Sequence, residues 1–413
     1  MAAVMTLTLA GICLIGVGRA QAAISASERQ ALLELYTSTD GEGWTRTTNW
    51  NGAAGTECTW FGVFCDVSET TVLALGLPSN NLAGTIPGTL GSLTNVQDLY
   101  LDFNELTGSI PTELGNLANL QLLRLQVNQL TGSIPTELGN LANLRYLELY
   151  DNRLTGAIPT ELGSLANLRV LRLSSNQLSG TIPTELGHLA NLQNLGLHSN
   201  QLTGEIPDGL GHLANLQFLY LYGNRLTGSI PTGLGNLRNL RYLQTASNQL
   251  TGSIPTELGH LTNLVSLDLR WNALSSTDAA LVAFLDSKQT GGDWQGTQTV
   301  PMTDLAPGAV TDSSVTLTWT PITYTGDAGG YEIFFATISG GPYTLSGTTA
   351  DKTASSWTVT GLTPGQPYHF MGRTVTNAGV NNQNTVVSEP SAEVSAVTPN
   401  RTHTVRRHLQ RAS

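Results

Sequence analysis

The sequence predicts a solenoid of leucine-rich coils stacked on a parallel β-sheet, followed by an all-β sandwich. Asparagine recurs nine times at intervals of 24 residues, from Asn80 to Asn272, without an insertion. A Gly-x-Ile-Pro segment follows eight of these asparagines. After residue 298, leucine gives way to Thr, Val and Gly, and apolar residues alternate with polar ones. A fixed period indicates stacked repeats, whereas alternation with a period of two indicates β-strands.

Each repeat follows the frame LxxLxLxxNxLxGxIPxxLGxLxxL, as in residues 120–143. The LxL segment predicts a short strand whose leucines point inward. The fixed asparagine can bond backbone groups where the strand ends, and the glycine supplies a turn conformation that other residues resist. Because one 24-residue unit cannot bury its leucines alone, the units must stack. We therefore expect a nine-stranded solenoid over residues 72–298, with an irregular or 3-10 helical convex side.

The frame resembles the plant-type subclass of leucine-rich repeats over residues 72–274, and with caps over roughly 24–298. Residues 23–71 resemble the N-terminal cap of that family, with helical periodicity in 28–36 followed by Trp44, Trp50 and Trp60. We expect these tryptophans to seal the first coil, the alternative being stacking on a sugar. A second capping helix is expected at about 277–286.

Residues 299–398 resemble a fibronectin type III domain, which implies an immunoglobulin-like sandwich. The segment 314–319 alternates with a period of two, and Trp319 matches the buried tryptophan of such domains. Leu362, Pro364 and Tyr368 match the tyrosine-corner pattern. The last segment, 399–413, is basic and is expected to be disordered.

The N-terminus predicts export from the cell. Residues 1–22 combine an apolar run with a small-x-small motif at Ala20-Gln21-Ala22, which is typical of a cleaved secretion signal. No Lys or Arg precedes the apolar run, so an uncleaved membrane anchor is the alternative. Cleavage leaves two cysteines, Cys58 and Cys65, and such a pair in an exported chain predicts a disulfide. The expected location is secreted or cell-surface.

Two features narrow the source and the partners. The single glycosylation acceptor triplet, which begins at Asn400, favours a bacterial or otherwise non-plant secreted or surface protein. A formal net charge of −11 argues against nucleic acid as a partner, because an acidic body repels phosphates.

Candidate chemistry is sparse along the chain. The sequence has no Gly-x-Ser-x-Gly or HExxH motif. One frame position on the outer surface holds His188, His212 and His260, and another holds Glu113, Glu137, Glu161, Glu185 and Glu257. We therefore predict no catalytic residue, no metal site and no cofactor. The chain is expected not to be an enzyme.

The strand positions between the frame leucines face the concave side of the solenoid and are free to vary. Aromatic residues and arginines at such positions favour a binding surface. The alternative is that the aromatics stabilise the sheet through cross-strand pairs. The main predicted patch is aromatic, and a secondary patch surrounds two adjacent arginines. The residues are Phe218, Tyr220, Tyr222, Tyr242 and Trp271 for the main patch, and Arg145, Arg169, Tyr146 and Tyr150 for the secondary patch.

Arg124, Glu148 and Arg172 occupy one column and are expected to form a charge ladder that needs no ligand. The sequence thus predicts an extracellular or cell-surface protein that binds a protein, peptide or polysaccharide on the concave face. The alternatives are a structural surface or stalk protein without a defined ligand, and an inhibitor of a cell-wall glycosidase, by analogy with plant inhibitors of this repeat class.

Overall fold

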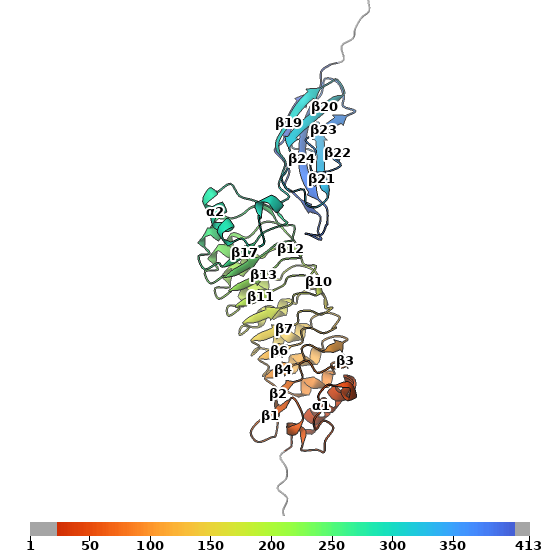
Figure 1. Ribbon diagram of the computed structural model, residues 1–413, viewed down its shortest axis with the longest axis vertical. Helices are drawn as coiled ribbons and strands as arrows, with labels where there is room; N and C mark the ends of the chain where they lie inside the picture. The colour runs from red at the N-terminus through yellow and green to blue at the C-terminus, as the bar shows by residue number, and fades with distance from the viewer. Residues whose placement is uncertain (1–22, 401–413) are drawn as a thin grey trace, which may run out of the picture.

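A computed structural model describes residues 23–400. Figure 1 shows a curved solenoid with a β-sandwich continuing beyond its C-terminal end. The predicted secretion signal and nearly all of the predicted basic tail lie outside the described residues. Within the described part, neither α-helix has the length and apolar character needed to span a membrane.

The N-terminal cap closes the first coil. Helix α1 (Ala26–Ser38) begins at a capping box formed by Ser25 and Glu28, and is followed by η1 (Gly41–Gly43) and η2 (Glu57–Thr59). Trp44, Trp50 and Trp60 are buried and pack ring against ring, as expected of a sealing core. These contacts leave no tryptophan face open for a sugar in this cap.

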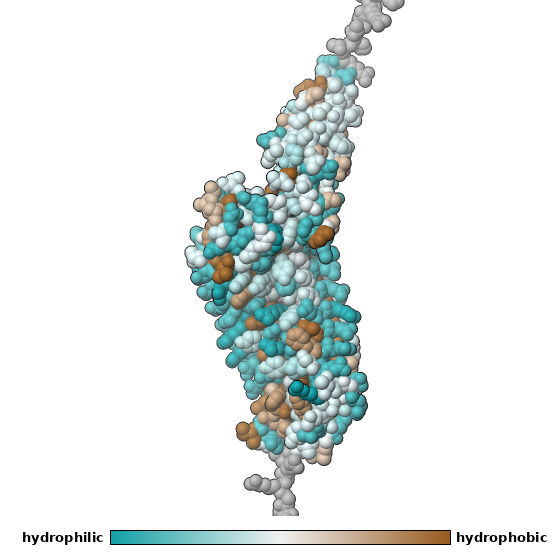
Figure 2. All heavy atoms as spheres, viewed as in Figure 1, coloured by the Kyte–Doolittle hydropathy of each residue, from teal (hydrophilic) through white to brown (hydrophobic). Residues whose placement is uncertain are grey.

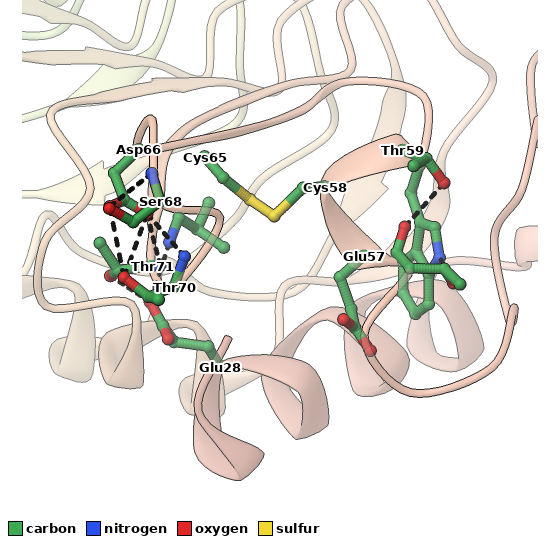
Figure 3. The surroundings of a disulfide bond; sticks show 12 residues. Glu28, Glu57, Cys58, Thr59, Cys65, Asp66, Ser68, Thr70 and Thr71 are labelled. Carbon is green, nitrogen blue, oxygen red and sulfur yellow. Dashed lines mark hydrogen bonds between the residues drawn. A yellow bond between two sulfur atoms is a disulfide. The ribbon is translucent and has the colours of Figure 1, made fainter. Parts of the chain in front are cut away.

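Cys58 and Cys65 form the predicted disulfide (Figure 3). It ties η2 to strand β1 (Val63–Cys65), which pairs antiparallel with the first repeat strand. Beneath it, buried Glu28 accepts hydrogen bonds from the Thr71 hydroxyl at 2.6 Å and from the Val72 amide at 3.0 Å. Helix α1 is thereby fixed to the start of the sheet.

The main sheet has ten strands, one more than the repeat frame predicts, because β1 of the cap adds an antiparallel edge. The nine repeat strands are parallel, and the register advances by 24 residues at each step. Their bounds are β2 (Val72–Gly76), β4 (Asp98–Tyr100), β6 (Leu122–Arg124), β7 (Tyr146–Glu148), β9 (Val170–Arg172), β11 (Asn194–Gly196), β13 (Phe218–Tyr220), β15 (Tyr242–Gln244) and β17 (Ser266–Asp268).

The convex side is 3-10 helical, as expected, and each short helix begins after the frame proline. These helices are η3 (Gly88–Ser92), η4 (Thr112–Asn116), η5 (Thr136–Asn140), η6 (Thr160–Ser164), η7 (Thr184–His188), η8 (Asp208–His212), η9 (Thr232–Asn236) and η10 (Thr256–His260). Short parallel strand pairs, which the sequence did not predict, lie between the two sides. They are β3 (Ala83–Thr85) with β5 (Glu105–Thr107), β8 (Thr155–Gly156) with β10 (Gln177–Leu178), β12 (Thr203–Glu205) with β14 (Arg225–Thr227), and β16 (Thr251–Ser253) with β18 (Ala273–Ser275).

The frame asparagines form the ladder that the sequence predicts. Asn152 Nδ2 donates to the carbonyls of Leu125 at 3.0 Å and Leu149 at 3.1 Å, while its Oδ1 accepts from the Leu130 amide at 3.0 Å. The residue before the asparagine adopts a left-handed conformation, as Asp151 does at φ 52°. The chain therefore turns sharply where every repeat strand ends.

Helix α2 (Ala279–Lys288) and η11 (Gln295–Thr297) close the far end of the solenoid. The sandwich packs a three-stranded sheet against a five-stranded one, with Trp319 edge-on to the fully buried Tyr331 at 5.2 Å. The Tyr368 hydroxyl oxygen accepts from the Thr363 amide at 2.9 Å, which is the expected corner. The strands are β19 (Thr303–Val310), β20 (Ser314–Thr320), β21 (Gly329–Ala336), β22 (Thr344–Thr348), β23 (Ser356–Thr360), β24 (Pro367–Thr376), β25 (Val386–Val387) and β26 (Val394–Val397).

The loop 377–385, between β24 and β25, docks the sandwich onto the solenoid. Asn382 Nδ2 donates to the carbonyls of Asn248 at 2.9 Å and Trp271 at 2.8 Å. The Ser247 hydroxyl donates to the Asn381 carbonyl at 2.8 Å. These bonds hold the loop along the edge where the last repeat strands end.

Candidate functional site

An aromatic cluster occupies the concave face on β11, β13 and β15. Phe218 stacks on Tyr242 with ring centroids 5.0 Å apart, because the parallel register sets the two residues side by side. Tyr222 stacks on His198 at 4.3 Å, and Tyr220 meets the same imidazole edge-on at 6.1 Å. We call these five residues the aromatic cluster. The structure thus brings together four of the five residues of the predicted main patch.

His198 is a member of the aromatic cluster that the site prediction left out. It occupies the same position in its repeat as Tyr222 does in the next, so the 24-residue register could have revealed the contact. Burial lowers the pKa of His198 and raises the pKa of Tyr220 and Tyr222. At neutral pH the cluster therefore carries no charge and presents flat faces with polar edges, which suits stacking and hydrogen bonding.

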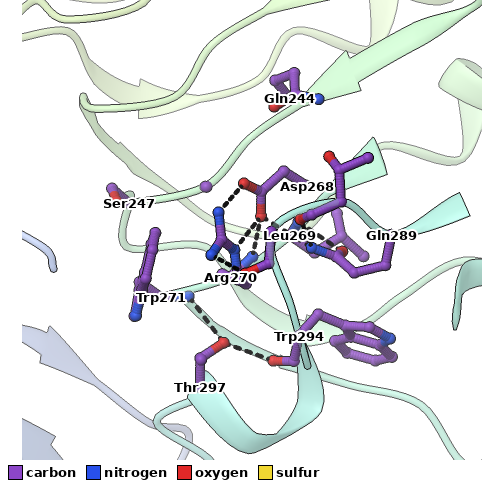
Figure 4. A network of polar contacts seen from close by, with 12 residues as sticks. Gln244, Ser247, Asp268, Leu269, Arg270, Trp271, Gln289, Trp294 and Thr297 are labelled. Carbon is purple, nitrogen blue, oxygen red and sulfur yellow. Dashed lines mark hydrogen bonds and ion pairs between the residues drawn. The ribbon is translucent and has the colours of Figure 1, made fainter. Parts of the chain in front are cut away.

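The structure places Trp271, the fifth predicted residue, at the domain junction rather than in the cluster. It lies at the left-handed position after its strand, with φ 56°, so its side chain leaves the concave face. The ring packs against the hydrophobic core of the sandwich and lies 4.2 Å from the Arg270 guanidinium. Arg270 is in turn held by Asp268 at 2.7 Å (Figure 4). Trp271 therefore serves the junction.

The two predicted arginines are neighbours, and both are exposed. The Arg169 amide donates to the Arg145 carbonyl at 2.8 Å, and the ion pairs of the described residues do not include either side chain. Glu148 lies between Arg124 and Arg172, at 3.5 Å from each. The charge ladder is therefore present, and the Arg145–Arg169 pair stays unbalanced.

The secondary patch is less compact than the aromatic cluster. Tyr146 and Tyr150 both come from β7 or the residues just after it, and both are partly exposed. Burial raises the pKa of Tyr150. Tyr150 forms one wall of a hollow on the concave face.

The hollow has a volume of about 300 Å³ and lies on the concave face between Tyr150 and Tyr220. It exists because β11 contributes only small groups there, among them Gly196. The residues around it are Tyr150, Asp151, Arg172, Ser174, Ser175, Asn194, Gly196, His198 and Tyr220. A second hollow, of about 480 Å³, lies beside it where the loop 377–385 meets the ends of the repeat strands.

Within residues 23–400, no three His, Cys, Asp or Glu side chains gather as a metal site requires. Figure 2 shows one face that is mostly hydrophilic, with separate hydrophobic spots. The arrangement is suited to selective binding in a shallow groove.

Known families match successive parts of the chain. "Leucine rich repeat N-terminal domain" matches residues 25–66, "Leucine Rich Repeat" matches 95–117 and 119–141, and "Leucine-rich repeat region" matches 150–290. "Fibronectin type III domain" matches 290–391. An inactive leucine-rich repeat receptor-like serine/threonine-protein kinase of Arabidopsis thaliana is 40% identical over 75 residues, which are 18% of this chain and 12% of that protein. The chain thus spans a small part of that relative.

Solved structures of plant proteins are similar over longer stretches. The Arabidopsis receptor kinase HAESA, in complex with the peptide hormone IDA and the co-receptor SERK1, is 32% identical with a TM-score of 0.58, covering 67% of this chain and 46% of that one. The plant peptide hormone receptor RGFR1 in complex with RGF2 is 38% identical with a TM-score of 0.51, covering 56% and 39%. A plant ice-binding protein is 30% identical with a TM-score of 0.52, and 97% of it is covered by 65% of this chain. The chain belongs to the leucine-rich repeat family.

Proposed function

We propose that this chain is a recognition protein of the cell exterior that binds a peptide on its concave face. The aromatic cluster carries the proposal. The frame does not require aromatic residues there, since the positions of Phe218 and Tyr220 hold Leu122 and Arg124 on β6. Partly exposed aromatic side chains on a rigid sheet are the usual anchors of protein interfaces.

The relatives support a peptide as the ligand. HAESA and RGFR1 are both described with bound peptide ligands, and both share the solenoid. A polysaccharide remains a second ligand class for the same face. The stalk interpretation does not account for an aromatic cluster beside a hollow.

Placement outside the cell rests on two features. The Cys58–Cys65 disulfide needs an oxidising environment, and the predicted signal in residues 1–22 would deliver the chain there. The similar receptor kinases carry this solenoid together with other parts, so their activities do not transfer as a whole. We propose a binding role without enzymatic activity. A bacterial or other non-plant source stays a prediction.

A selection of phage-displayed random peptides on the full chain tests the function. Tyr220→Ala with Tyr222→Ala should weaken the selected peptides by ~30-fold or more, about 2 kcal/mol. Arg145→Ala with Arg169→Ala should weaken them less and mainly alter the salt dependence. Tyr100→Ala, in the same column as Tyr220 but outside the cluster, is the control. Peptides that bind both double variants like the unchanged protein would exclude the concave face.

A further inference from the structure

The hollow between Tyr150 and Tyr220 is made by the residues of one strand. Gly196 lies between Arg172 on β9 and Tyr220 on β13, its partners in the neighbouring strands. Asn194 likewise lies between Val170 and Phe218. Strand β11 therefore lies as a floor between two rows of larger side chains.

The fold does not require the glycine at 196. Its φ is not in the left-handed region, and an added Cβ would meet its nearest neighbour, Arg172 Cγ, at an ordinary 3.7 Å. Gly211, a frame glycine, differs sharply, because a Cβ there would come within 2.4 Å of the Gly233 carbonyl oxygen. Glycine weakens a strand interior, so a glycine without a steric reason indicates that the empty space itself is useful.

Asn194 supplies the polar group at the floor of the hollow. The residue is only 7% exposed, and its Oδ1 is buried without a hydrogen-bond partner. Its side-chain amide makes no hydrogen bond to any other residue that the structure describes. A buried unpaired amide destabilises a protein, and a ligand group that both donates and accepts would satisfy it.

The floor of the hollow is uncharged, and the charged groups lie at its walls and rim. Arg172 is paired with Glu148, and the opposite wall carries the uncharged ring of Tyr220 with the His198 imidazole behind it. Asp151 lies exposed at the rim rather than at the floor. A charged side chain that reached the floor would lose its hydration there, where Asn194 and Gly196 offer no opposite charge.

We propose that the hollow is a specificity pocket for one uncharged peptide side chain that ends in a hydroxyl or a carboxamide. The side chain would be Ser, Thr, Tyr, Asn or Gln, held between Tyr150 and Tyr220 with its polar end on Asn194. The proposal rests on the proposed function, since it assigns a residue class to the peptide bound on the same face.

The test fills the pocket without harming the fold. Gly196→Gln places in the column a side chain that β15 already carries at Gln244. Gly76→Gln is the matched control: it lies in the same column on β2, its φ is not left-handed, and an added Cβ there meets nothing closer than 3.6 Å. Both variants should melt at or above the temperature of the unchanged protein.

The probes are phage-displayed random peptides selected on the unchanged full chain. We expect one peptide position to be enriched in the five residue types named above. Gly196→Gln should weaken the selected peptides by ~30-fold or more, whereas Gly76→Gln should leave them unchanged. Asn194→Leu should weaken them by about 10-fold without lowering the melting temperature, because it removes an amide that has no partner in the fold.

A double-mutant cycle identifies the contact itself. Replacing the enriched residue by its apolar counterpart, such as Thr by Val, should weaken binding to the unchanged protein but not to Asn194→Leu. Peptides that lose binding with the Tyr220 and Tyr222 variants but not with Gly196→Gln would overturn the pocket and leave the proposed function standing. A selection that yields no binding peptide would overturn both. An oligosaccharide that binds, and is lost with Gly196→Gln, would overturn the peptide assignment.

Discussion

The side chain of Asn152 makes hydrogen bonds to backbone groups of its own coil and of the coil before it. Its Nδ2 lies 3.0, 3.1 and 3.3 Å from the carbonyl oxygens of Leu125, Leu149 and Tyr150, and its Oδ1 lies 3.0 Å from the Leu130 nitrogen. Asn152→Ala removes all of these bonds and leaves the backbone groups buried. At about 1 kcal/mol for each bond, and less for the longest, the free energy of unfolding should fall by about 3 kcal/mol.

Asn143→Ala is the control for this substitution. Asn143 makes one hydrogen bond, to the Ala118 carbonyl at 2.9 Å, and it lies exposed on the convex side. Its loss should lower the free energy of unfolding by about 0.5 kcal/mol, because water replaces the exposed bond. Urea titration followed by circular dichroism measures both variants. Losses that agree within about 0.5 kcal/mol would refute the view that the buried ladder holds the coils together.

Three further predictions concern the cap, the sandwich and the junction. Reduction of the Cys58–Cys65 disulfide should lower the stability of the cap by about 2 kcal/mol, and an unchanged melting temperature would contradict this. Burial lowers the pKa of Lys352 to about 8, while the unfolded chain keeps this lysine protonated up to about pH 10. The free energy of unfolding of the sandwich should therefore rise from pH 8 to pH 10, and Lys352→Met should abolish the rise. Asn382→Ala, which removes one buried and one partly buried hydrogen bond to the solenoid, should destabilise the junction by about 2 kcal/mol and speed amide exchange in the loop 377–385. Gln383→Ala, exposed in the same loop, should leave exchange unchanged.

The repeat frame made most of the fold predictable, because a constant 24-residue spacing fixes both the strands and their register. Strands such as β13 lie where LxL stands in the sequence. The short pairs, such as β12 with β14, were missed because Thr-Gly-Glu at 203–205 has little strand preference by itself. Those strands form because stacking of the coils brings successive turns within hydrogen-bonding distance.

The concave columns were equally predictable, and so was the contact between Phe218 and Tyr242. Two parts of the site were not. The role of Trp271 depends on where the sandwich docks, and that follows from side chains more than a hundred residues away. The hollow at Gly196 is made by a missing side chain, whereas a search for binding residues looks for large or charged ones.

The junction also bounds the concave face at the edge where the strands end. Asn382 bonds the carbonyls of Asn248 and Trp271, and Asn384 bonds the Asn224 carbonyl, so the loop lies along three successive coils. The hollow beside this loop is lined by Ser199, which directly follows the His198 of the aromatic cluster. Because these hydrogen bonds hold the loop 377–385 against the solenoid, this edge of the groove is rigid. A peptide anchored on the aromatic cluster would therefore have the loop 377–385 of the sandwich domain beside it at that edge.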